Sequence, residues 1–162
     1  MSEWVALAGV VLGVMLGFGG QVILDHRQKA RRLDEARRAL YVQFLTAAKL
    51  ALEHLARGAT ERINADVQRG AYSGAYLEDH ADLQTAISGM QLVSTGAVLG
   101  QAEAMREAHW AIAEREGNAE PPGNDERMAV AEQVAADLKR LSGMRDAFVV
   151  AAKLELRLSS RL

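Results

Sequence analysis

The sequence predicts an all-α protein, with one N-terminal transmembrane helix followed by an antiparallel four-helix bundle. Trp4 to Leu24 contains no charged residue, which is typical of a membrane span. From Asp25 onward, apolar residues recur at spacings of three and four, as on amphipathic helices. About half the residues are apolar but only 5% are aromatic, and the only prolines are Pro121 and Pro122. We therefore expect an anchor over residues 1–24 and a cytoplasmic helical bundle over residues 25–162.

The anchor has the length that a bilayer requires. Twenty-one residues at about 1.5 Å each span roughly 30 Å, the thickness of the hydrocarbon core. Trp4 lies at one end, where indole favours the membrane interface. A cleaved signal peptide is the alternative, but it needs basic residues before a shorter apolar run. Only Met1, Ser2 and Glu3 precede this run, so the sequence favours a retained span.

Basic residues follow the anchor directly and indicate its orientation. Six Lys or Arg residues fall between Arg27 and Arg38, and none precedes the span. The positive-inside rule then places the N-terminus outside and the C-terminal domain in the cytoplasm of a single-pass cell-membrane protein. We expect Arg27, Lys29, Arg31 and Arg32 to contact anionic lipid headgroups, although fixing the topology would by itself account for them. A nucleic-acid site is the less favoured interpretation of a basic block in this place.

Three glycines in the anchor form one face of its helix. Gly9, Gly13 and Gly17 recur every fourth residue, and small residues at this spacing allow close approach between membrane helices. This glycine stripe predicts self-association of the span. Contact with a different membrane protein, or with lipid alone, remains open.

Four amphipathic helices are expected after the anchor. The first continues from the span to Gly58 or as far as Arg69, before a turn at residues 70–74. The second covers roughly 75–93, with Tyr76, Leu83, Ile87 and Met90 on one face. The third begins after an N-cap at Ser94 or Thr95 and ends near Glu116. After a loop over 117–124, Asn124 is expected to cap the fourth, which Ser142-Gly143 could kink and whose end, around Leu154 to Leu158, frays. Short connections favour up-down-up-down packing.

No pattern of residues predicts catalysis, a cofactor or a metal. Cysteine is absent, which excludes disulfides and thiolate chemistry. No Glu lies three residues before a His, no zinc-protease motif occurs, and no phosphate-binding loop occurs. We predict neither a small-molecule substrate nor a nucleic-acid partner.

Two polar features have simple structural interpretations. Glu78, Asp79, His80 and Asp82 are expected to point in different directions at a solvated helix start. His109 lies on an apolar stripe and is expected to be a hydrogen-bonded core or boundary histidine.

The first third of the chain resembles a loose group of uncharacterised single-pass proteins from high-GC Gram-positive bacteria and their phages. The resemblance rests on the charge-free anchor, on Arg31-Arg32 and on the run Arg37-Arg38-Ala-Leu-Tyr-Val-Gln-Phe-Leu-Thr-Ala-Ala48. It implies a small helical bundle behind the anchor and no particular activity.

Three classes of function remain for such a chain. The first is a non-enzymatic interaction or scaffold module, held at the membrane and partnered by lipid, a second copy or another membrane protein. The second is a phage-type lysis or immunity protein that acts on the membrane. The third is an enzyme without a recognisable motif. The absence of site motifs favours the first.

Overall fold

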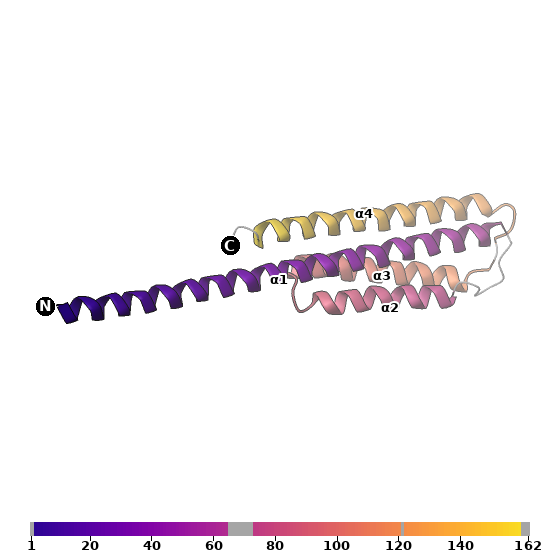
Figure 1. Ribbon diagram of the computed structural model, residues 1–162. Coiled ribbons are helices and arrows are strands. Elements are labelled where there is room, and N and C mark those ends of the chain that lie inside the picture. Colours follow the sequence, from indigo (N-terminus) through magenta and orange to yellow (C-terminus); the bar gives the residue numbers. More distant parts are fainter. Residues whose placement is uncertain (1, 65–72, 121, 160–162) are drawn as a thin grey trace. The chain divides into compact units, whose positions relative to one another are not determined.

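The computed structural model describes residues 2–64, 73–120 and 122–159, with the side chains of 28–64, 74–120 and 122–159. These ranges contain four helices and no strand (Figure 1): α1 Ser2–Ile63, α2 Ser73–Met90, α3 Gly96–Asn118 and α4 Arg127–Ser159. The all-helical prediction is confirmed. The chain divides into two compact units, Met1–Ala36 and Arg37–Leu162.

The first unit holds the N-terminal part of α1. The predicted span, Trp4 to Leu24, lies outside the residues whose side chains are described. In the part of the chain whose side chains are described, no helix has a stretch long and apolar enough to cross a membrane.

The second unit is a helical bundle in which successive helices run in opposite directions (Figure 1). Side-chain contacts join each helix to its neighbours. His54 of α1 meets Asp79 of α2, and His80 of α2 meets Trp110 of α3. Arg115 of α3 meets Asp137 of α4, while Arg37 of α1 meets Glu155 near the end of α4. We call the end with Arg37 and Glu155 the entry end and the opposite end, with Arg62 and Asn118, the far end.

The core of this unit is built mainly from alanine and aliphatic residues, with a small aromatic cluster. Phe44 and Phe148 are completely buried, with ring centroids 4.6 Å apart. Tyr41 meets the edge of Phe148 at 5.7 Å. These rings join α1 to α4, while Leu55, Leu83, Ile87, Met105 and Leu141 fill the rest of the interior. Such burial is the main favourable term in holding the helices together.

The bounds of α1, α2 and α4 differ from the predicted ones, with α2 covering Ser73–Met90 rather than roughly 75–93. The two predicted caps, at Asn124 and at Ser94 or Thr95, are not formed by these side chains. Helix α1 ends at Ile63, and Asn64 is in a turn. The predicted extension to Arg69 falls on residues 65–69, which lie outside the described residues. Helix α4 begins at Arg127, because Asn124 to Glu126 form a turn. Thr95 is the N-cap residue of α3 but makes no side-chain cap, since its hydroxyl instead donates to Glu155 at 2.9 Å.

Candidate functional site

Charged and histidine side chains occupy buried positions at three levels of the bundle. Burying a charge lowers stability unless the charge is paired, so these levels are the candidate sites of the bundle. They are the Arg37–Glu155 cluster at the entry end, the His54–Asp79–His109 cluster further along, and the Arg62–Glu116 cluster at the far end.

The entry-end cluster joins three helices. Arg37 Nε lies 3.3 Å from Glu155 Oε1 and donates to the Val93 carbonyl. The Thr95 backbone amide donates to both oxygens of Glu155, at 3.1 and 3.2 Å. The first turn of α3 is therefore capped by a carboxylate from α4, which complements the positive end of the helix dipole.

The Tyr41 hydroxyl lies inside the same cluster. It has no hydrogen-bond partner among the described residues, and neither has the buried Ser94 Oγ. The pKa of Tyr41 is raised to about 12, chiefly by burial and also by the nearby Glu155 carboxylate, while Ser94 and Arg37 oppose the shift. A phenol with this pKa stays protonated at neutral pH.

The central cluster brings one acidic and two histidine residues together from three helices. His54 Nδ1 lies 2.9 and 3.0 Å from the two oxygens of Asp79, and His109 Nε2 lies 3.9 Å from Asp79 Oδ2. His109 is almost completely buried, and neither ring nitrogen has a hydrogen-bond partner in the described part of the chain. The prediction that His109 lies in the core is therefore confirmed, whereas the hydrogen bond predicted for its ring is not found among the described residues.

Burial dominates the electrostatics of this cluster. It lowers the pKa of His109 to about 4, helped by the neighbouring His80 and His54. It also raises the pKa of Asp79, against the stabilising hydrogen bond and charge of His54. His109 is therefore neutral at pH 7, and the cluster contains one accessible histidine, His54, beside a carboxylate.

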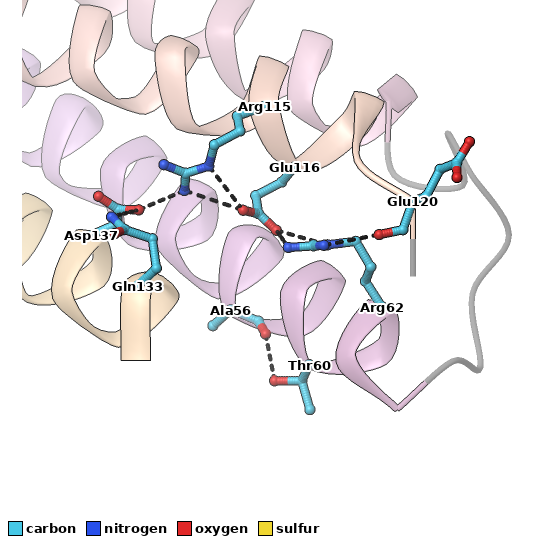
Figure 2. Close-up of polar contacts among 8 residues, drawn as sticks. All are labelled: Ala56, Thr60, Arg62, Arg115, Glu116, Glu120, Gln133 and Asp137. Carbon is cyan, nitrogen blue, oxygen red and sulfur yellow. Dashed lines mark hydrogen bonds and ion pairs between the residues drawn. The ribbon is translucent and has the colours of Figure 1, made fainter. Parts of the chain in front are cut away.

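The far-end cluster is the most highly connected (Figure 2). Arg62 Nη2 and Nε donate to Glu116 Oε2 at 2.8 and 3.1 Å, and Arg62 Nη1 donates to the Glu120 carbonyl at 3.1 Å. Arg115 contacts the other oxygen of Glu116 at 3.2 Å and also bonds to Asp137. Because the Glu116 side chain is only 4% exposed, this network connects the ends of α1 and α3 to α4.

The spacing of these residues explains why they lie inside. Along α1, alternating steps of four and three residues connect Arg37, Tyr41, Phe44, Ala48, Ala51 and Leu55. Met105, His109, Ile112 and Glu116 do the same on α3, and Tyr76, Asp79 and Leu83 do so on α2. These steps keep a seam of residues facing neighbouring helices. The charged members therefore occupy core positions of a coiled-coil-like bundle.

The open grooves on this unit are separate from the buried clusters, with one exception. A groove of about 440 Å³ at the entry end is lined mainly by apolar residues, including Ala97, Ala151, Leu154 and Leu158, together with Arg37 and Glu155. A groove of about 220 Å³ between α2 and α3 is lined by Tyr76, Trp110 and their neighbours. In the described part, no set of three or more histidine and acidic side chains is arranged to hold a metal ion.

All seven predicted site residues lie in the first unit. Lys29, Arg31 and Arg32 are exposed on α1. Gly9, Gly13, Gly17 and Arg27 belong to α1 as backbone but lie outside the residues whose side chains are described.

Sequence reasoning missed the buried charges and misplaced Asp79. Asp79 was expected at a solvated helix start, yet it is only 5% exposed and paired to His54. The position of Asp79, three residues after Tyr76 and four before Leu83, was the signal that could have placed it on the buried face. Glu116 lies four residues after Ile112, and Glu155 lies seven after Phe148, so the same reading would have found both.

Comparison of the chain with protein-family profiles, with curated proteins and with solved structures finds no match.

Proposed function

We propose that this chain is a non-enzymatic interaction or scaffold module, anchored in the cell membrane by Trp4–Leu24 and carrying its helical bundle in the cytoplasm. The observation that carries the proposal is that the buried charged side chains form ion pairs between helices. The pair Arg37–Glu155 joins α1 to α4, and the pair Arg62–Glu116 joins α1 to α3. Such contacts between helices are expected of groups that hold helices in register.

An enzyme would be expected to present such groups to a substrate-sized cavity. In the described bundle the most deeply buried histidine, His109, faces the core, and its low pKa favours the neutral form. The entry-end groove and the groove between α2 and α3 expose mostly apolar surface, and only the entry-end groove also contacts a buried ion pair, Arg37 and Glu155. Apolar surface of this kind suits the binding of another macromolecule.

The basic segment after the anchor supports a membrane location. Lys29, Arg31 and Arg32 are exposed, and a basic residue near an anionic bilayer contributes roughly 1 kcal/mol to binding. Exposed basic side chains at this place on α1 are what contact with anionic headgroups requires.

Flotation with lipid vesicles tests the membrane part of the proposal. The full chain should float with neutral and anionic vesicles alike, whereas a chain that begins at Ala30 should remain at the bottom of the gradient with neutral ones. Anionic vesicles should retain part of the shorter chain, and Arg31→Gln with Arg32→Gln should reduce that part. Full-length protein that stays at the bottom with both vesicle types would contradict the proposal.

A further inference from the structure

The C-terminal half of α4 carries an apolar surface that the bundle does not cover. Five residues of this half recur at steps of three or four and so lie on one side of the helix. We call them the outer stripe: Gly143, Ala147, Val150, Leu154 and Leu158. All five are exposed, and Val150, Leu154 and Leu158 are 67%, 58% and 57% exposed. The buried residues Leu141, Phe148 and Ala152 lie on a different face.

The outer stripe borders the entry-end groove. Leu154 and Leu158 line both, with Ala97 and Thr95 of α3 on the opposite wall. Large exposed apolar residues at successive helical turns are the pattern by which a helix packs against another helix. The occupant is therefore expected to be helical.

We infer that the occupant is a second copy of this chain, whose α4 packs antiparallel on the outer stripe. The stripe is complementary to itself in this direction. Its N-terminal end carries the small residues Gly143 and Ala147, and its C-terminal end carries the large residues Leu154 and Leu158. An antiparallel register that sets Ala147 of one copy opposite Val150 of the other also sets Gly143 opposite Leu154. Because the pair has two-fold symmetry, both of these small-to-large contacts occur twice.

The charges beside the outer stripe favour the same direction. Asp146 and Lys153 are exposed, one heptad apart, on one flank of the stripe. In an antiparallel pair equivalent flanks face each other, so Asp146 of each copy meets Lys153 of the other. In a parallel pair Asp146 would instead face Ala151, Lys153 would face Leu158, and Gly143 would face Gly143 across an empty space. Asp146 contacts Arg145 of its own chain at 3.2 Å, an exposed contact that a partner lysine can supplement.

The contact is short, so the pair should be weak and reversible. The outer stripe covers sixteen residues, or about 24 Å of helix, so each copy contributes only one short helix face to the contact. The inference rests on the bundle alone and stands or falls separately from the anchor.

Single cysteines test both the contact and its direction, because the chain has none of its own. The full-length protein in detergent micelles is treated with a short bifunctional thiol reagent. Val150→Cys lies near the two-fold axis and should cross-link to its copy. Leu158→Cys should not, because its counterpart lies about 28 Å away along the helix axis. Thr85→Cys, an exposed position on α2, gives the background level.

Every outcome is decisive. Cross-linking at Val150→Cys alone supports the antiparallel pair. Cross-linking at both positions, or at Leu158→Cys alone, overturns it in favour of parallel packing. Background yield at both positions overturns self-association, and lipid or another protein then covers the stripe.

A charge exchange gives a second readout. In the Val150→Cys background, Asp146→Lys should weaken association roughly tenfold, because two attractions become two repulsions. Adding Lys153→Asp should restore the original yield. Equal yields in all three proteins would contradict the assigned pairing.

Discussion

At the scale of single residues, this bundle is organised by buried polar groups in a core that is otherwise alanine-rich and aliphatic. Asp79 is paired with His54, Glu116 with Arg62 and Glu155 with Arg37. Removing one member of a buried pair costs about 3–5 kcal/mol, whereas replacing both by apolar residues is often neutral. We therefore expect the pairs to select one arrangement of the helices more than they add to its stability.

The far-end pair allows a direct test. Glu116→Leu leaves the Arg62 guanidinium without its carboxylate and should lower the free energy of unfolding by about 3 kcal/mol. Adding Arg62→Met should recover most of the loss. The exposed neighbour Glu114 supplies a control, since Glu114→Leu should change stability by less than about 0.5 kcal/mol. Denaturant unfolding followed by circular dichroism measures all three, and a double variant no more stable than Glu116→Leu would argue against this role.

His109 should make the bundle sensitive to acid. Its pKa in the folded state is about 4, against an ordinary value of 6.5. The unfolded chain therefore takes up a proton first as the pH falls, and stability is lost between about pH 6.5 and 4, by up to about 3 kcal/mol. The raised pKa of Asp79 acts in the opposite sense, because the folded state then takes up its proton more readily.

Replacing the histidine separates these two effects. His109→Gln cannot titrate, so its stability should fall less between pH 7 and 4 than that of the unaltered chain. The measurement is the free energy of unfolding at a series of pH values for both proteins. Parallel curves would show that His109 does not cause the acid sensitivity.

At the scale of helices, the apolar periodicity predicted the elements well and the polar core poorly. Tyr76, Leu83, Ile87 and Met90 form the buried face of α2 as expected. Asp79 belongs to the same face but was assigned to solvent, because a carboxylate is seldom buried unless it is paired and its partner, His54, is distant in sequence. Pairing across helices depends on the packing, which a single sequence does not specify. The Thr95 hydroxyl shows the same dependence, because it bonds to Glu155 of α4 instead of capping α3.

The predicted span carries an element-scale prediction of its own. Lipid tails are as apolar as leucine, so two spans associate through close packing, which glycines at every fourth position permit. Replacing Gly13, the centre of the glycine stripe, by Ile should sharply reduce the signal in a bacterial transmembrane-association reporter. Leu12→Ile lies off the stripe and should have little effect. Equal signals for both variants and the unaltered span would leave the glycines without a role in association.

At the scale of the whole molecule, the division into two units gives the bundle its own core. The buried cluster of the second unit begins at Tyr41 and includes residues of all four helices. A chain that begins at Ala30 retains all of these residues. It should be soluble and strongly helical by circular dichroism, and a disordered chain at low protein concentration would mean that the anchor or a partner completes the core.

The central claim is that Trp4–Leu24 spans the membrane with the bundle in the cytoplasm. The most direct measurement is the activity of topology reporters fused to the two ends of the full chain in its native host. We predict export of an N-terminal reporter and cytoplasmic activity of a C-terminal one, following the basic residues between Arg27 and Arg38. A cytoplasmic N-terminus, with the C-terminal reporter either exported or also cytoplasmic, would contradict the account.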